Sequence, residues 1–182
     1  MNCYGCKELA AAFRTVRNNT IQIAEDIPDS KYEFRAAPDT RTVGQTLTHI
    51  ALGPTFQHHI QSNKITDMKN VNFQALMQQV MAEEAKPRTK AEIIAFLKSE
   101  GDRFASFLEG LSESFLAEQV TMPPGMTPAT KSRFEMLLGT KEHEMHHRGQ
   151  LMLVQRMLGL VPHLTRQMQE RLAQAQAAQA QR

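Results

Sequence analysis

The sequence lacks the features that mark nucleic-acid-binding, membrane-spanning and secreted proteins. Its 182 residues include 21 lysines and arginines against 19 aspartates and glutamates, so the formal net charge is only +2. A charge this small argues against a nucleic-acid partner. No apolar run approaches the roughly 20 residues that are needed to span a bilayer. The first residues, MNCYGCKELAAAF, lack a basic start followed by an apolar core, so we expect no secretory signal and a cytoplasmic protein.

Cysteine is scarce, and Cys3 and Cys6 are the two that the chain contains. Their C-x-x-C spacing is typical of a redox motif when a strand precedes it, and no strand can precede residue 3. A structural zinc site would need two further cysteine or histidine ligands. We therefore favour thiols of a frayed terminus that have no chemical role.

The sequence does contain helical periodicity along nearly its whole length. Apolar residues recur at intervals of three and four, the spacing that places them on one face of an α-helix. The first such face is formed by Leu9, Phe13, Val16, Thr20, Ile23 and Ile27. Pro28 is expected to end this helix, and residues 28–39, which hold two prolines, are expected to form a loop.

Three capping boxes predict where later helices begin. In this motif the side chains of the first and fourth residues each bond the other's backbone N–H. The three boxes are Thr42-Val-Gly-Gln45, Thr89-Lys-Ala-Glu92 and Ser132-Arg-Phe-Glu135. Pro54 lies within the first of these helices, and an interior proline costs about 3 kcal/mol, so we expect a kink or a break there. Gly101 is a weak point of the second.

A shorter amphipathic helix is expected between the first two capped helices. Its apolar face would carry Phe73, Leu76, Met77, Val80 and Met81. Residues 63–70 are polar and residues 119–130 contain Pro-Pro-Gly, so both read as loops. Gly159 and Pro162 should end the last capped helix.

Together these segments predict an all-α protein. Four main amphipathic helices with one or two short extra ones, and no alternating apolar runs of strand type, pack naturally as an antiparallel four-helix bundle. We assign this bundle to residues 1–162. Residues 163–182 are rich in glutamine and alanine, and we expect them to form a polar helix or a tail beyond the bundle.

Three of the seven histidines lie within five positions of the last capped helix. His143 and His147 are four residues apart, so their rings lie on one face, one turn apart, where two imidazoles can bind one divalent ion. At about 100° per residue, Gln150 and Val154 share this stripe, and apolar residues flank it. We expect both rings to face the interior, where a metal, a carboxylate or a backbone carbonyl would satisfy their nitrogens.

A third ligand can be sought among the remaining histidines. His49 lies on the apolar stripe of the helix that follows Thr42. His58 and His59 are adjacent, so they cannot share a face. His146 is turned about 60° from His143 and could compete as a ligand, whereas His163 follows the end of the helix.

The predicted tripod is therefore His49, His143 and His147. Three neutral imidazoles leave coordination positions open, which is typical of a catalytic rather than a closed structural site. Zinc and nickel both suit imidazole, and the sequence does not choose between them.

Three segments of the chain carry a family resemblance. They are Ile27-Pro-Asp-Ser-Lys-Tyr-Glu-Phe-Arg35, Thr42-Val-Gly-Gln-Thr-Leu-Thr-His-Ile50 and His143-Glu-Met-His-His-Arg-Gly-Gln-Leu151. With them the chain resembles, from about Leu9 to Pro162, the DinB/YfiT-like superfamily of small four-helix-bundle proteins that are regarded as metalloenzymes. The family's metal triad maps onto His49, His143 and His147.

The resemblance implies a metal-dependent enzyme that activates a nucleophile. Better understood relatives use the bound metal to activate a low-molecular-weight thiol for S-transfer or isomerisation, so we expect an S-transferase-like or hydrolase-like activity on a small-molecule substrate. A homodimer is expected by analogy. Gln150 would bond a ligand histidine or the bound group. Glu144 and Arg148 are expected to pair on the helix surface, and Gly149 to allow close helix approach.

Two other interpretations fit parts of the sequence. His143-Glu-Met-His-His147 matches H-E-x-x-H, the zinc protease motif, with Glu144 as general base and Glu170 as a downstream third ligand. Against this, Glu144 lies away from the centre of the histidine stripe, and no strand is present to align a peptide substrate. The second alternative is a non-catalytic metal-binding or stress-response bundle, because a fold does not fix a function.

Overall fold

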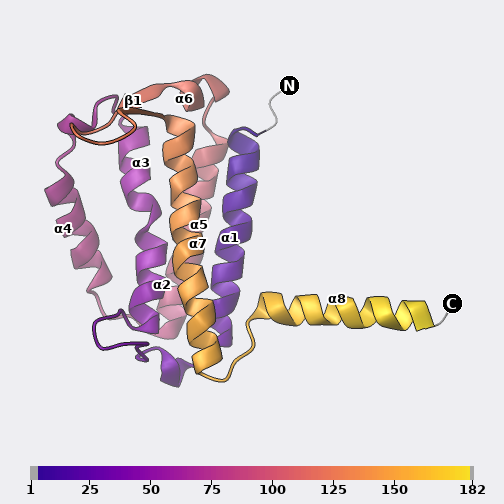
Figure 1. The fold of residues 1–182 in the computed structure, drawn as a ribbon. Coiled ribbons are helices and arrows are strands. Elements are labelled where there is room, and N and C mark those ends of the chain that lie inside the picture. The colour runs from indigo at the N-terminus through magenta and orange to yellow at the C-terminus, as the bar shows by residue number, and fades with distance from the viewer. Residues whose placement is uncertain (1–3, 181–182) are drawn as a thin grey trace.

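Four helical columns pack side by side along a common axis in the computed structural model, which describes residues 4–180 (Figure 1). The columns are α1 (Cys6–Asp26), α2 with α3 (Val43–Leu52 and Pro54–Ser62), α5 (Lys90–Glu109) and α7 (Arg133–Met157). Helix α1 packs against α5 and α7, and α2 packs against the same two helices. The predicted all-α four-helix bundle is therefore confirmed.

The shorter elements lie beside the columns and at their ends (Figure 1). They are α4 (Phe73–Glu84), α6 (Glu113–Ala117), the antiparallel strands β1 (Gln119–Thr121) and β2 (Thr130–Ser132), α8 (His163–Ala180) and two 3₁₀ turns (Asp29–Lys31 and Met68–Asn70). Because α4 carries the chain back along the outside of the bundle, α2–α3 and α5 run in the same direction, opposite to α1 and α7 (Figure 1). Helices α2 and α7, which carry the predicted ligands, are therefore antiparallel neighbours.

The predicted helix starts are confirmed by their caps. The boxes at Thr42 and Thr89 are both complete. Ser132 caps α7 by accepting a hydrogen bond from the backbone N–H of Glu135. Pro54 breaks the second column as predicted and is the first residue of α3. Proline is tolerated there because the N–H groups of the first helical turn have no acceptor within the helix.

Two of the three clusters of buried apolar side chains lie between the main helices of the bundle. One includes Leu47 of α2, Leu97 of α5 and Leu151 of α7. The other includes Phe13 and Phe104, whose rings meet edge to face with centroids 5.0 Å apart. Since Leu47 and Leu151 belong to the same cluster, the core itself holds together the two helices that carry the predicted histidines.

A buried ion pair joins α1 to α7. Arg17 and Glu144 are only 3% and 2% exposed, and Arg17 Nη2 lies 3.0 Å from Glu144 Oε2. Thr20 donates a further hydrogen bond to Glu144 at 2.7 Å. The predicted surface pair of Glu144 with Arg148 is therefore wrong, because Glu144 points into the bundle and meets a partner 127 residues away in the sequence.

Two predictions at the edge of the bundle are corrected. The segment 119–130, predicted to be a loop, begins as β1 and runs into β2, and arms of three residues are too short to show a periodic pattern. On α4, Leu76 is buried, but Phe73 and Met81 of the predicted apolar face are 56% and 64% exposed. Helix α4 packs mainly against α2, so only a narrow stripe of it is covered.

The N-terminal cysteine prediction is partly overturned. Cys6 is the first residue of α1 and is buried, and its backbone N–H donates to Glu113 at 2.9 Å. Burial and the nearby Glu113 carboxylate raise the pKa of the Cys6 thiol to about 11, the opposite of a reactive cysteine. Cys3 lies outside the described residues.

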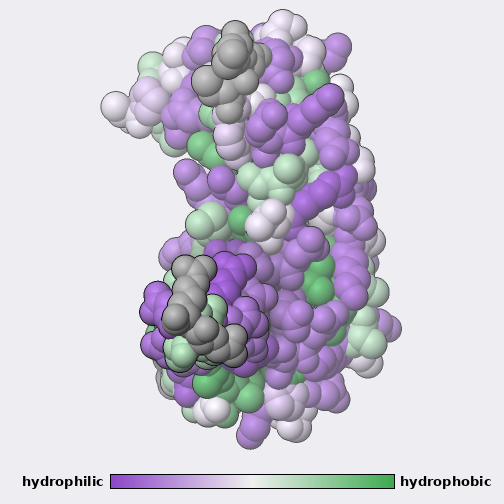
Figure 2. Space-filling view, turned by 90° about the vertical axis from the view of Figure 1, so that its right-hand side faces the viewer, coloured by the Kyte–Doolittle hydropathy of each residue, from purple (hydrophilic) through white to green (hydrophobic). Residues whose placement is uncertain are grey.

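Helix α8 projects from the end of the bundle, which confirms the predicted polar helix. Its first residue, His163, is buried and lies 3.1 Å from Asn19 Oδ1, whereas residues 167–180 are exposed. Figure 2 looks onto the side from which α8 projects and shows a mostly hydrophilic surface with apolar residues in small groups.

Among residues 4–180, no helix combines the length and the apolar character that crossing a membrane requires. The division into domains at residue 162 stays a prediction.

Candidate metal centre

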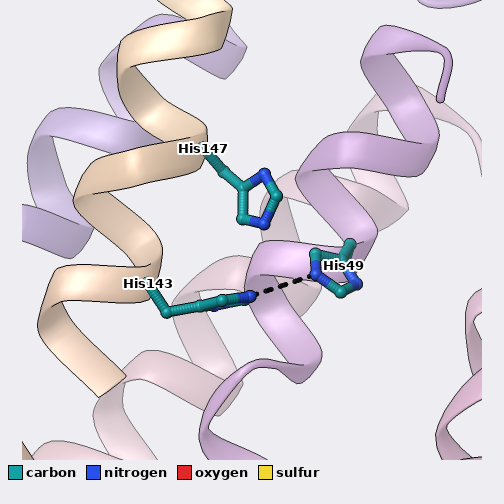
Figure 3. Close-up of side chains that lie close together, drawn as sticks. All are labelled: His49, His143 and His147. Atoms are coloured by element: carbon teal, nitrogen blue, oxygen red, sulfur yellow. Dashed lines mark hydrogen bonds between the residues drawn. The ribbon is translucent and has the colours of Figure 1, made fainter. Parts of the chain in front are cut away.

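Three histidine rings from two helices meet on one side of the bundle (Figure 3). His49 comes from α2, and His143 and His147 come from successive turns of α7. One nitrogen of each ring lies within 4.8 Å of a nitrogen of both others. Within residues 4–180, no other three histidine, cysteine or carboxylate side chains come this close together. The structure therefore brings the predicted tripod together.

The spacing of one pair of ring nitrogens, those of His49 and His143, fits a tetrahedral ion. His49 Nε2 and His143 Nε2 are 3.2 Å apart. Two nitrogens that each bind zinc at about 2.0–2.1 Å with tetrahedral angles lie roughly 3.3 Å apart. The three ring centroids are 4.6–5.0 Å from one another. Three protein nitrogens in this arrangement would leave a coordination position for a water or a substrate atom.

Two of the three rings are oriented by side chains behind them. His49 Nδ1 lies 3.0 Å from Glu84 Oε2 on α4, and Arg41 bonds the other oxygen of the same carboxylate. His147 Nδ1 lies 2.8 Å from Gln150 Oε1, as the sequence predicted for Gln150. An N–H donated at Nδ1 leaves the lone pair on Nε2, the nitrogen that faces the other rings.

The third ring, His143, lies against the junction of α2 and α3. Gly53 occupies that junction, and a Cβ atom added there would come within 3.1 Å of His143 Nδ1. The absence of a side chain at Gly53 lets the ring approach the backbone. The junction between α2 and α3, where Pro54 breaks the helix, therefore forms one wall of the site.

Burial favours the neutral form of two of the three imidazoles, His143 and His147. Burial lowers the pKa of His143 from its ordinary 6.5 to about 4, and the neighbouring His147 and His49 add to this effect. Burial also lowers the pKa of His147. Although burial opposes its charge, the hydrogen bonds from Arg41 and His49 hold the pKa of Glu84 below its usual value. Neutral imidazole is the form that binds metal, so burial prepares His143 and His147 for an ion at neutral pH.

The lowered pKa of His143 predicts an acid-sensitive fold. The unfolded chain takes up a proton on His143 near pH 6.5, whereas the folded chain resists it until about pH 4. The free energy of unfolding of the metal-free protein should therefore fall as the pH is lowered from 6.5 towards 4. Urea denaturation at pH 7 and pH 5 in a chelator measures this, and His143→Gln should reduce the fall. An equal fall in both proteins would count against the assignment.

Glu84 should support metal affinity without touching the ion. Glu84→Ala frees the Nδ1 side of His49, and loss of such an outer partner typically costs about 10–100-fold in metal affinity. Competition with a chromophoric chelator measures this change. Glu83→Ala is the matched control, because Glu83 pairs with Lys86 and Arg88 instead. Equal affinities of the two variants would show that Glu84 has no such role.

The other histidines lie outside the tripod. His146 is exposed and lies 3.1 Å from the Gln150 amide nitrogen. Its ring also meets that of His147 edge to face, with centroids 4.9 Å apart, so it borders the site without joining the tripod. The ring of His58 packs on Phe107, with centroids 4.8 Å apart, and His59 is exposed.

The position of Glu144 argues against the protease interpretation. Both of its oxygens bond Arg17, on the side of α7 that faces α1. A carboxylate held in this way cannot serve as general base at the histidines. Glu170, the third ligand in that interpretation, is exposed on α8. The prediction that Gly149 allows close helix approach is also wrong, since a Cβ there would meet nothing within 4 Å.

The tripod separates two cavities of different character. His147 and Gln150 border a cleft of about 670 Å³ that is also lined by Arg35, Arg41 and Glu84. His49 and His143 border a second cavity of about 430 Å³, which has mostly apolar walls. An ion on the three rings would thus be reachable from a charged side and from an apolar side.

Comparison with known proteins places this architecture in a family. Residues 12–151 match the DinB superfamily. The chain is 22% identical over 152 residues to the uncharacterized protein YjoA of Bacillus subtilis, an alignment that covers 84% of this chain and 90% of YjoA. The crystal structure of YjoA, a DinB-like protein, superposes with a TM-score of 0.63 at 20% identity, over 84% of this chain and 92% of that one.

Two further solved structures share the fold at lower identity. YfiT from Bacillus subtilis, described as a probable metal-dependent hydrolase with an unusual four-helix bundle topology, has a TM-score of 0.65 at 15% identity, covering 88% of this chain and 91% of YfiT. The mycothiol-dependent maleylpyruvate isomerase has a TM-score of 0.61 at 13% identity, covering 81% of this chain and 61% of that one. The family match spans most of the helical bundle, together with His49, His143 and His147. The chain belongs to the DinB superfamily.

Proposed function

We propose that His49, His143 and His147 hold a divalent metal ion in an enzyme that activates a thiol or a water as nucleophile. The observation that carries the proposal is the 3.2 Å approach of two Nε2 atoms, with a third ring beside them, in a site where burial lowers the pKa of His143 and His147. A bound ion would lower the pKa of a thiol or a water and so supply a nucleophile at neutral pH. Zinc or nickel would suit three imidazoles.

The side chains around the tripod would orient the reactants. Glu84 and Gln150 fix the ring positions of His49 and His147. Arg41 is paired with Glu84, and Arg35 lines the same cleft beside His147, where its guanidinium would be a partner for a carboxylate of a small polar thiol. The description of YfiT as a probable metal-dependent hydrolase and the mycothiol dependence of the isomerase support both forms of the proposal, with water or thiol as nucleophile.

The transferase form is a simple exchange of bonds. The S–H bond of the thiol breaks and its proton passes to the buffer. The sulfur lone pair forms a bond to an electrophilic carbon, and the leaving group departs with the electron pair of its bond to that carbon. The hydrolase form is the same exchange with water in place of the thiol.

Metal removal tests this function. Zinc-loaded and nickel-loaded protein should accelerate the conjugation of cysteine or another small thiol with 1-chloro-2,4-dinitrobenzene, and chelation should abolish the acceleration until metal is restored. A panel of esters tests the hydrolase form in the same way. Metal binding without turnover on either panel would favour the alternative, a non-catalytic metal-binding bundle.

A homodimer and a cytoplasmic location remain predictions. Size-exclusion chromatography with light scattering would test the first, and cell fractionation the second.

A further inference from the structure

The cavity of about 430 Å³ on the His143 side of the tripod has a composition unlike that of the cleft on the other side. Its walls come from α2, α3, α4, α7, strand β2, the 3₁₀ turn that begins at Met68 and the residue that follows β1. They include Phe56, Met68, Phe73, Met77, Met122 and Met136. A volume of this order matches cavities that bind small organic molecules.

The cavity offers no unpaired ionic side chain to a ligand. Lys131 and Glu135 are the charged residues that line it, and they lie 3.7 Å apart as an ion pair. The cleft beside His147, in contrast, is lined by Arg35, Asp39, Arg41 and Glu84. A charged molecule would lose hydration in the apolar cavity without gaining a partner, so its occupant should be neutral.

Methionine gives the cavity its adaptability. Four of the chain's 11 methionines line it, and their thioethers are flexible, polarisable and favourable next to aromatic rings. Phe56 and Phe73 add an edge-to-face pair with centroids 5.6 Å apart. Such walls accept flat aromatic or unsaturated molecules of varied outline.

We propose that this cavity binds a neutral, apolar small molecule, aromatic or unsaturated, as the acceptor on which the nucleophile acts. His49 and His143 form part of its wall, so a molecule seated there would present its reacting carbon to the tripod, while the polar nucleophile enters from the cleft beside His147. The acceptor role rests on the proposed function. The binding site itself does not, because the cavity exists without an ion.

The binding test uses metal-free protein and N-phenyl-1-naphthylamine, a neutral probe with a phenyl and a naphthyl group whose fluorescence rises in apolar surroundings. Met77→Trp should fill the cavity and weaken probe binding at least tenfold. Met81→Trp, one turn further along α4 and 64% exposed, should leave it within twofold. Met122→Trp narrows the cavity from another wall and should act like Met77→Trp, and thermal unfolding verifies that each variant is folded. Absence of probe binding to the wild type, or equal effects of the substitutions at 77 and 81, would overturn the assignment.

The acceptor role is tested with metal-loaded protein. Met77→Trp should raise the KM for 1-chloro-2,4-dinitrobenzene at least tenfold, whereas Met81→Trp should not. If probe binding follows the cavity but the wild type shows no metal-dependent turnover, the proposed function fails and the binding site stands. If turnover is present but neither KM nor probe binding responds to Met77→Trp, the cavity assignment fails and the proposed function stands.

Discussion

His143→Ala should weaken zinc binding by more than about a hundredfold and abolish metal-dependent turnover. Loss of an outer partner already costs about 10–100-fold, and this change removes a ligand itself. His143 is central to the tripod, since its Nε2 lies 3.2 Å from that of His49 and its ring centroid 4.6 Å from that of His147. Competition titration with a chelator measures the affinity, and thiol conjugation measures turnover.

Two histidine variants serve as controls for this prediction. His59 is exposed and outside the site, so His59→Ala should behave like the wild type. His146 contacts His147 and Gln150 but lies outside the tripod, so His146→Ala should weaken binding much less than His143→Ala. A larger loss for His146→Ala would move the ligand to that residue and overturn the assigned tripod.

Arg17→Met should lower the free energy of unfolding by about 3–5 kcal/mol, because it leaves the Glu144 carboxylate buried without its cation. Arg17 donates to both oxygens of Glu144, at 3.0 and 3.1 Å, and to the backbone carbonyls of Ile50 and Leu97. It therefore joins α1, α2, α5 and α7 at one point. Urea denaturation at pH 7 measures the change.

A double variant distinguishes the effect of removing the whole ion pair from the effect of leaving one charge unpaired. Replacing both charges, as in Arg17→Met with Glu144→Leu, removes the unpaired charge and should destabilise less than either single change. Arg103→Ala is the surface comparison, since the pair it forms with Glu100 is partly exposed and should contribute no more than about 1 kcal/mol. A loss below about 1 kcal/mol for Arg17→Met would contradict the structural role.

Much of the fold could be predicted because its signals are local. A capping box spans four residues and an amphipathic face repeats every three or four, so the helix starts at Thr42 and Thr89 needed no tertiary information. The same holds for His143 and His147, which share a face of one helix. His49 was found because its own stripe is apolar, and the core that includes Leu47 and Leu151 brings the two helices together.

What the sequence did not predict depends on contacts between distant segments. Glu84 meets His49 across 35 residues, and nothing in the pattern of α4 distinguishes it from Glu83. Glu144 was expected at the surface because its partner Arg17 lies on another helix. Gly101 was predicted to be a weak point of α5. In the structure it makes room for the Arg17 side chain, since a Cβ at Gly101 would come within 2.7 Å of Arg17 Cγ.

X-ray absorption at the zinc edge, on wild-type protein loaded with one equivalent of zinc, would show directly whether the three histidines bind one ion. Coordination by the three histidines predicts three imidazole nitrogens at about 2.0–2.1 Å, an oxygen in the remaining position and no sulfur until a small thiol is added. Coordination by fewer than three imidazoles, or by a cysteine sulfur in the absence of added thiol, would contradict a metal centre built from His49, His143 and His147.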